Sequence, residues 1–181
     1  PVVYTACHGV GYPYVSRMFQ AFGLPPVIPV DEQTLTPNPD FPTLPKPNPE
    51  EIGAMDLAIA VAKARGARLV LANDPDADRL GVAEVDSETG EVRVFSGDET
   101  AVLLADYLLE RYPKQGSGDD GGGGREKLAM VASTVSSKML ASMARREGFL
   151  FVEGLTGFKW LSKTAADVKA QHPGMRVVLA Y

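Results

Sequence analysis

The densest group of chemically able side chains in the sequence is the run DPDAD at residues 74–78, which Arg79 follows directly. Three like charges this close together repel one another unless a cation neutralises them. Carboxylate oxygens suit a hard divalent ion, Mg²⁺ or Ca²⁺, better than Zn²⁺. The apolar stretch 68–72 before the run predicts a buried strand, and open α/β sheets bind ligands at the carboxyl ends of their strands. We therefore predict a metal site formed by Asp74, Asp76 and Asp78.

Other interpretations of this loop remain open. A calcium EF-hand is disfavoured, because Arg79 stands where that loop needs glycine and Val85 where it needs its bidentate glutamate. An aspartyl-phosphate phosphatase would need a lysine and further acidic motifs in a set order, and we cannot place them. A solvated acidic turn is the simplest alternative. The guanidinium of Arg79 is suited either to pair with the carboxylates or to donate hydrogen bonds to a phosphate.

Two further segments have residues of interest. Ser136, Ser137 and Lys138 lie at a predicted strand-to-helix turn, where backbone N–H groups can meet an anion. The alternative is that a serine only caps the helix. The motif CHGVG at 7–11 has two glycines but Tyr14 where a dinucleotide loop has its third, so we expect His8 to hydrogen-bond locally and Cys7 to be buried.

Alternating strand and helix patterns predict the fold class. Residues 31–49 contain six prolines, which indicates an extended, polyproline-like surface segment, with Asn48 capping the next helix and Ile52 facing inward. We expect an α/β fold of two consecutive domains, 1–96 and 97–181, with mixed, largely parallel sheets. Residues 113–126 are low in complexity and predict a mobile surface insertion. Strands are predicted at 2–6, 27–30, 68–72, 80–85, 92–95, 128–132, 149–153 and 176–181, and helices at 14–22, 49–65, 99–111, 136–147 and 159–170.

Composition disfavours some classes of function. The chain has 181 residues and a net charge of −5, with scattered lysines and arginines, so a nucleic-acid-binding surface is not expected. No apolar run is long enough to span a bilayer, so no membrane partner is expected. The single cysteine is typical of a reducing compartment, which predicts a cytoplasmic protein.

The loop DPDADR at 74–79 is similar to the metal-binding loop of the α-D-phosphohexomutases. Further stretches extend the resemblance in the right order, and together they look most like the branch with phosphoglucomutase 2 and the phosphopentomutases. The resemblance covers almost the whole chain except 113–126, and it matches the second and most of the third of four domains, the latter truncated. These stretches are TACHGVG at 5–11, PNPEE at 47–51, FSGDE at 95–99, ASTVSSKML at 132–140 and GLTGFKWL at 154–161.

The resemblance implies an intramolecular phosphotransferase that interconverts a sugar 1-phosphate and a 6- or 5-phosphate. The reaction would pass through a sugar 1,6-bisphosphate, and Mg²⁺ would lie between the three aspartates and a phosphoserine of the first domain. Position by position, the resemblance implies sugar contacts from Gly154, Thr156 and Gly157. It places Lys159 where a general acid/base is proposed, although a phosphate-binding lysine is the equal alternative.

The resemblance also implies what the 181 residues lack. Neither the phosphoserine loop nor the phosphate-binding fourth domain is present, so we expect no mutase turnover from this polypeptide alone. Its expected partners are small phosphorylated sugars and domains 1 and 4 of the same protein. A stand-alone divalent-cation-binding module and the phosphatase are the alternatives. The candidate residues are Arg79 and Lys159 for catalysis, Ser136, Lys138, Gly154, Thr156 and Gly157 for substrate, and Asp74, Asp76 and Asp78 for metal.

Overall fold

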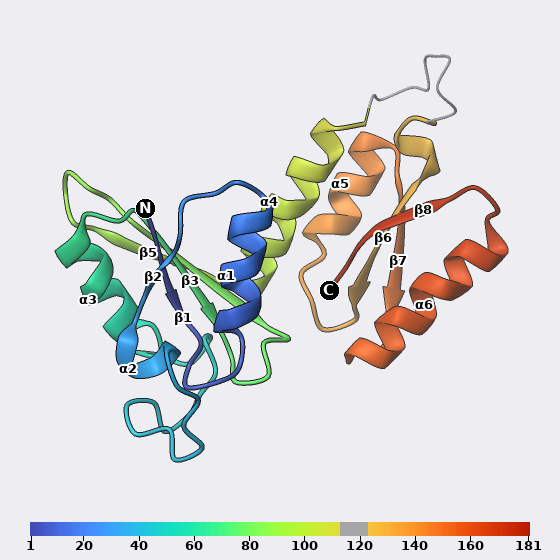
Figure 1. The fold of residues 1–181 in the computed structure, drawn as a ribbon. Coiled ribbons are helices and arrows are strands. Elements are labelled where there is room, and N and C mark those ends of the chain that lie inside the picture. The colour runs from blue at the N-terminus through green and yellow to red at the C-terminus, as the bar shows by residue number, and fades with distance from the viewer. Residues whose placement is uncertain (113–122) are drawn as a thin grey trace. The chain divides into compact units, whose positions relative to one another are not determined.

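The computed structural model describes residues 1–112 and 123–181. The chain divides into two compact units, Pro1–Gly97 (unit 1) and Asp98–Tyr181 (unit 2), and each has an α/β architecture of its own (Figure 1). Most of the insertion predicted at 113–126 lies outside the described residues. No helix of the described ranges has the length and apolar content needed to cross a bilayer.

Unit 1 contains a five-stranded sheet in the order β2-β1-β3-β4-β5. Strand β1 pairs in parallel with β2 and β3, whereas β3–β4 and β4–β5 are antiparallel. The sheet is therefore mixed, as predicted, but it is not largely parallel: two of its strand pairs are parallel and two are antiparallel. The strands are β1 (Val2–Thr5), β2 (Ile28–Pro29), β3 (Leu69–Asn73), β4 (Leu80–Val85) and β5 (Val92–Phe95).

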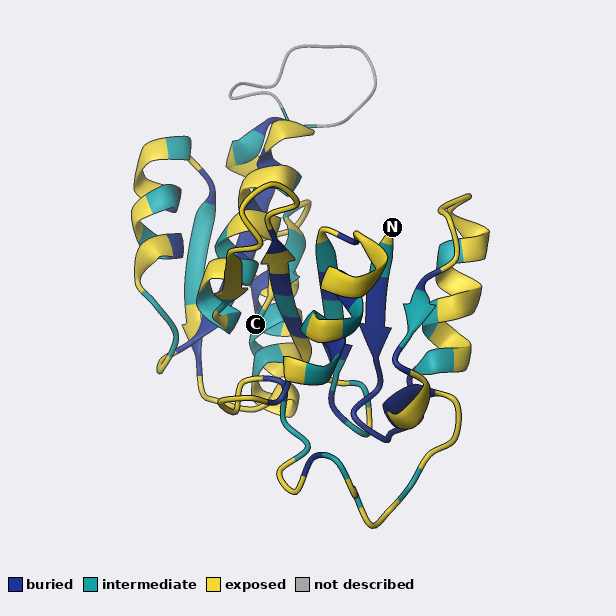
Figure 2. Cartoon of the chain, turned by 90° about the vertical axis from the view of Figure 1, so that its left-hand side faces the viewer, coloured by how far each residue is buried: buried dark blue, intermediate teal, exposed yellow. Residues whose placement is uncertain are grey.

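Helices cover both faces of this sheet, as alternate side chains of β1 require. Val3 is fully buried in a core shared with Ala58 and Ala62 of α3 (Asp56–Arg65). Its neighbour Tyr4 packs in a separate cluster with residues of α1 (Tyr12–Ala21). Figure 2 shows the result for β1, the strand that begins beside the N-terminus, which is coloured mainly as buried.

The predicted start of the second long helix is wrong. Residues 49–55 form turns, and the helix begins only at Asp56. Gly53 adopts a left-handed φ of 81°, which a helix cannot continue through, and Ile52 is fully exposed instead of facing inward. Asn48 accepts a hydrogen bond from the N–H of Glu50 at 3.1 Å, so it caps a turn. The predicted end is confirmed, since Gly66 closes the helix in the left-handed conformation.

The polyproline prediction for residues 31–49 is also wrong. The segment opens with a short helix, α2 (Asp31–Thr34), and continues as hydrogen-bonded turns. Gln33, Thr34 and Leu44 are buried, and the N–H of Asn38 donates to the carbonyl of His8 at 2.9 Å. Proline spacing alone did not reveal these anchors, which hold the segment compactly against the loop after β1.

Unit 2 is built on a three-stranded, fully parallel sheet in the order β7-β6-β8. Every residue of the central strand β6 is buried, as expected for a strand covered on both faces. Figure 1 shows α4 and α5 on one side of this sheet and α6 on the other. The elements are α4 (Gly97–Glu110), the 3₁₀ turn Arg125–Lys127, β6 (Leu128–Ser133), α5 (Met139–Glu147), β7 (Leu150–Gly154), α6 (Phe158–Gln171) and β8 (Arg176–Ala180).

Candidate metal centre

The topology of unit 1 brings two loops together at one edge of the sheet. The chain passes from β1 to β2 on one side and then to β3 on the other, so the loops after β1 and β3 leave the carboxyl ends of neighbouring parallel strands. This is the position at which open α/β sheets bind ligands. The loops contact each other directly, since the N–H of Val10 donates to the carbonyl of Pro75 at 2.9 Å.

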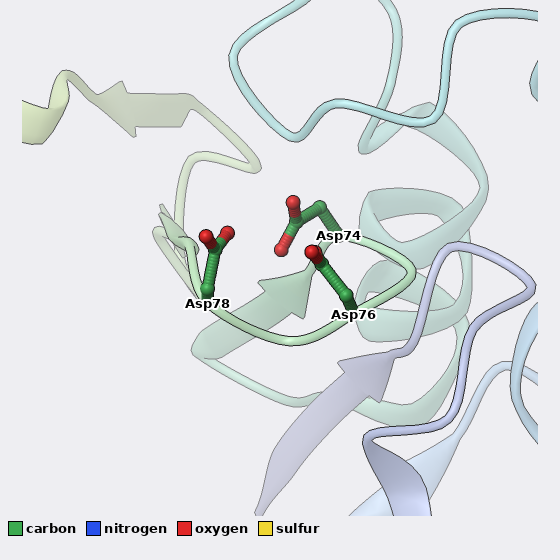
Figure 3. Close-up of side chains that lie close together, drawn as sticks. All are labelled: Asp74, Asp76 and Asp78. Carbon is green, nitrogen blue, oxygen red and sulfur yellow. The ribbon is translucent and has the colours of Figure 1, made fainter. Parts of the chain in front are cut away.

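The loop after β3 gathers the three predicted carboxylates. Asp74, Asp76 and Asp78 each offer one oxygen, and these oxygens all lie within 4.8 Å of one another (Figure 3). A hydrogen bond from the N–H of Ala77 to the carbonyl of Asp74, at 2.9 Å, closes the turn, and Ala77 adopts a left-handed φ of 62°. Asp74 is buried and the other two aspartates are exposed. The three groups therefore converge instead of spreading into solvent.

The donor set and its spacing fit a hard divalent cation. Two oxygens bound to one Mg²⁺ lie at most about 4.2 Å apart, because each bond is about 2.1 Å long. Three oxygens on one octahedral ion also include adjacent pairs about 3.0 Å apart. The exposed Asp76 and Asp78 side chains would therefore have to move inward from their present spacing, within 4.8 Å, to share one ion. Three monodentate carboxylates also leave coordination positions for other oxygen ligands, such as a phosphate.

Arg79 neutralises the buried member of the trio. Its backbone N–H donates to Oδ1 of Asp74 at 3.0 Å, and its Nε and Nη2 lie 2.8 and 2.7 Å from Oδ2. Nε is also 3.6 Å from Oδ1 of Asp78. Of the two roles considered for Arg79, the structure contains the ion pair. About half of its side chain is exposed, so the guanidinium keeps access to solvent.

These contacts move the pKa values of two aspartates in opposite directions. Burial would raise the pKa of Asp74, but the backbone N–H and guanidinium of Arg79 together lower it below its ordinary value. The pKa of Asp78 is raised, chiefly by the charge of Asp74. Asp74 therefore holds its charge to lower pH than an ordinary aspartate, and Asp78 accepts a proton more readily.

The candidate sugar-facing segments of unit 2 lie side by side. Strands β6 and β7 pair in parallel, and the N–H of Thr134 donates to the carbonyl of Gly154 at 2.9 Å. Ser136 is joined to Ser133 by a 2.7 Å hydrogen bond between their hydroxyls. Gly154 is buried, and a Cβ there would approach the Thr164 hydroxyl to 2.8 Å. The structure thus brings the 133–138 and 154–159 segments to the same edge of the sheet.

The charged groups of these segments have specific partners. Lys138 pairs with Glu153 and donates to the carbonyl of Thr134 at 3.1 Å. The N–H of Ser137 does meet an anion, the carboxylate of Asp98, at 2.8 Å. Helix α5 begins at Met139, later than predicted, and the hydroxyl of Ser137 accepts the N–H of Met139 at 3.2 Å. Ser137 therefore makes the anion contact, but it does not cap α5, since Lys138 occupies the N-cap position and the helix has no side-chain cap bond.

The loop before α6 exposes most of its candidate residues. Gly157 has a φ of 112°, and its carbonyl accepts the N–H groups of Trp160 and Leu161 at 3.0 and 3.1 Å. Thr156 and Lys159 are exposed, and Lys159 is the second residue of α6. Burial, which would favour a proton-transfer role for Lys159, is not provided by the described part of unit 2. A role as a point charge for phosphate has no such requirement.

Sequence reasoning assigned no part of the metal site to the loop after β1, although the structure packs it against the aspartate loop. A Cβ on Gly9 would lie 2.1 Å from Cα of Pro75, so the approach requires glycine. Cys7 is fully buried, as predicted, whereas Nε2 of His8 lies 2.7 Å from the hydroxyl of Thr43, a partner 35 residues away in the sequence. The close pair of glycines after a strand was the signal for this contact.

Comparisons with known proteins assign the family. Residues 1–87 match "Phosphoglucomutase/phosphomannomutase, alpha/beta/alpha domain II", and residues 96–174 match domain III of the same family. Over 180 residues, 99% of the chain, it is 45% identical to the phosphopentomutase of Homo sapiens and 43% identical to the glucose 1,6-bisphosphate synthase of Mus musculus. The chain spans 28% of the length of each.

Solved structures agree with this assignment. A phosphoglucomutase/phosphomannomutase family protein from Burkholderia thailandensis superposes with a TM-score of 0.65 at 25% sequence identity, and the match covers 93% of this chain and 31% of that one. The fold, the two consecutive domain matches and the near-complete coverage by relatives all point to one family. The chain belongs to the phosphoglucomutase/phosphomannomutase family, the α-D-phosphohexomutases, and carries its domains II and III.

Proposed function

We propose that this chain supplies the Mg²⁺-binding loop and the sugar-facing loop of an intramolecular phosphotransferase acting on phosphorylated sugars. The convergence of the Asp74, Asp76 and Asp78 oxygens within 4.8 Å is the observation that carries the proposal. Its relatives include a phosphopentomutase and a glucose 1,6-bisphosphate synthase, whose names both refer to phosphorylated sugars or their bisphosphates. The reaction would interconvert a sugar 1-phosphate and a 6- or 5-phosphate through a bisphosphorylated sugar.

In this proposal the three aspartates hold Mg²⁺, which when bound offsets negative charge on a transferring phosphoryl group. Asp74 is suited to anchor the ion, because Arg79 keeps it ionised although it is buried. Asp76 and Asp78, exposed on the same loop, complete the carboxylate set. Arg79 has a half-exposed side chain, so it can exchange its pairing with Asp74 for a pairing with a phosphate oxygen.

Unit 2 would face the sugar. Gly154, Thr156 and Gly157 supply backbone and hydroxyl groups, and Lys159 at the start of α6 supplies a positive charge for a phosphate or the general acid/base. Ser136 lies on the neighbouring loop, and Lys138 needs to leave Glu153 before it can bind an anion. The phosphoserine that receives and donates the phosphoryl group is not among these 181 residues. We therefore expect no turnover from this polypeptide alone.

The metal assignment is tested on the chain itself. Isothermal titration calorimetry with Mg²⁺, and with Mn²⁺ as its substitute, should show binding at one site. Each of the single variants Asp76→Asn and Asp78→Asn should abolish this binding. The exposed Asp40→Asn is the matched control, because it removes the same charge from a residue outside the run 74–78 and should leave binding unchanged. Binding that survives both loop substitutions would exclude this site as the ligand set.

The catalytic assignment needs the rest of an enzyme around the chain. A chimera in which these residues replace the aligned 180-residue segment of the human phosphopentomutase should interconvert pentose 1-phosphate and 5-phosphate. The same chimera with Asp76→Asn and Asp78→Asn should be folded and inactive. A folded chimera that binds Mg²⁺ but has no mutase activity would contradict the catalytic proposal and would favour a cation-binding module.

A further inference from the structure

We propose that Tyr4 is a positioning residue for the metal loop and that it acts through the side-chain amide of Asn73. The inference rests on the proposed function, because it takes the three aspartates as metal ligands. Tyr4 lies on strand β1, outside the loop that it would position. Its role would be to hold the ends of that loop at the separation that lets the carboxylates converge.

Two hydrogen bonds connect Tyr4 to the loop. The buried Tyr4 hydroxyl donates to Oδ1 of Asn73 at 3.0 Å, and Nδ2 of Asn73 donates to the carbonyl of Arg79 at 2.6 Å. Asn73 and Arg79 immediately flank the acidic run 74–78. The second bond therefore closes the loop across its two ends, and the first bond ties that closure to the sheet.

The tyrosine contact also fixes which way the amide points. An asparagine side chain offers a carbonyl oxygen on one side and an N–H donor on the other. With its oxygen accepting from Tyr4, its nitrogen faces the carbonyl of Arg79; a reversed amide would set oxygen against oxygen. Burial raises the pKa of Tyr4, so the hydroxyl remains a donor throughout the neutral range.

The glycine pair after β1 makes this arrangement possible. A Cβ on Gly11 would lie 2.4 Å from the Tyr4 hydroxyl oxygen, and a Cβ on Gly9 would lie 2.1 Å from Cα of Pro75. Between them, the N–H of Val10 donates to the carbonyl of Pro75. The motif that does not fit a dinucleotide loop thus has another purpose: it leaves room for Tyr4 and for close packing against the metal loop.

Loop closure should affect metal affinity, because Mg²⁺ requires near-ideal octahedral geometry from its ligands. Removal of a residue that orients metal ligands from outside the first coordination sphere typically costs about 10–100-fold in affinity. Tyr4 acts through one intermediate residue, so Tyr4→Phe should weaken binding by about tenfold, at the lower end of that range. Asn73→Ala removes the closing bond itself and should weaken binding by several tens of fold.

The test measures Mn²⁺ affinity of the full 181-residue chain from the electron paramagnetic resonance signal of the unbound ion. The variants are Tyr4→Phe, Asn73→Ala and the double variant, each compared with Tyr12→Phe. The Tyr12 ring stacks on that of Tyr4 with centroids 6.3 Å apart, so this control removes a hydroxyl from the same cluster. Tyr12→Phe should bind like the parent chain, and the double variant should bind no more weakly than Asn73→Ala.

These measurements separate a positioning role from a purely structural one. If Tyr4→Phe lowers thermal stability but leaves Mn²⁺ affinity unchanged, the residue only supports the core and the proposal is overturned. If the two substitutions weaken affinity independently in the double variant, Tyr4 does not act through Asn73, and the proposal is overturned as well. If the parent chain itself binds no Mn²⁺ or Mg²⁺, the proposed metal site fails, and the positioning role fails with it.

Discussion

Arg79→Gln should lower the unfolding free energy of unit 1, and bound Mg²⁺ should restore most of the loss. The substitution removes two N–H groups, at 2.8 and 2.7 Å, from Oδ2 of Asp74, whose side chain is 1% exposed. A hydrogen bond to a charged group contributes about 1.5–3 kcal/mol, and loss of one partner of a fully buried ion pair costs about 3–5 kcal/mol. Because Arg79 is half exposed and its backbone N–H still serves Oδ1, we expect a loss of about 2 kcal/mol in the metal-free state.

The chain contains a separate probe for each unit. Its only cysteine, Cys7, is buried in unit 1, and its only tryptophan, Trp160, lies in unit 2. Pulsed thiol labelling along a urea gradient therefore reports unfolding of unit 1, while tryptophan fluorescence follows unit 2. In the presence of a chelator, Arg79→Gln should shift only the thiol-labelling transition to lower urea.

Saturating Mg²⁺ should restore most of the loss. A ligand that binds only the folded state stabilises it increasingly as its affinity rises, and the variant should bind Mg²⁺ more tightly because a competing cation has been removed from Asp74. Arg79→Lys keeps the positive charge but loses the planar guanidinium, so its stability without metal should lie between those of the parent chain and Arg79→Gln. An equal loss of stability with and without Mg²⁺ would refute the reasoning, since Arg79 would then support the fold by packing and not by neutralising Asp74.

Three further predictions concern single residues of unit 1. Burial raises the pKa of Cys7 to about 11, so disulfide reagents should label it only after unfolding; rapid labelling of the native chain would contradict its burial. Gly9→Ala should cost about 2–3 kcal/mol in urea unfolding through its clash with Pro75, whereas Gly23→Ala, with open space around it, should cost about 1 kcal/mol through its left-handed φ; equal losses would exclude crowding as the cause. In a carbon-13 titration of the metal-free chain, Asp78 should protonate above its ordinary pKa and Asp74 below it, and Asp74→Asn should return Asp78 toward the ordinary value. An Asp78 titration that is unaffected by Asp74→Asn would contradict the coupling. The stabilisation from ionised Asp74 is present above its unfolded-state pKa and is lost as the pH falls through its lowered folded-state pKa.

Hydrophobic patterning was a good guide to the strands and a poor guide to where helices begin. Strands β3 to β5 lie within a residue of their predicted bounds, because short apolar runs between turn residues have few alternative structures. The start of α3 was misplaced because Asn48, Pro49 and two glutamates form a favourable N-terminal pattern in isolation. The left-handed Gly53 overrides that pattern, and a glycine's φ cannot be read from its neighbours.

The proposed ligands of the candidate site were visible in the sequence, but the residues proposed to position them were not. Three alternating aspartates after a strand indicate a cation site by composition alone. Tyr4 gives no such sign, because a tyrosine in an apolar strand is usually a core residue, and its bond to Asn73 spans 69 positions. The pairing of Ser137 with Asp98 spans 39 positions and was missed for the same reason. Contacts between distant segments depend on strand order, which local patterns do not encode.

The charges of the loop explain why an arginine directly follows the trio. A buried carboxylate needs a partner in every state of the protein, because an unpaired buried charge is strongly destabilising. The Arg79 guanidinium is that partner for Asp74 when no metal is bound. Three carboxylates with one arginine have a net charge of −2, which a single divalent ion neutralises. In the proposed function, a bound divalent ion would therefore take the place of Arg79 at Asp74 without leaving that carboxylate unpaired, and the displaced guanidinium would become available to a phosphate.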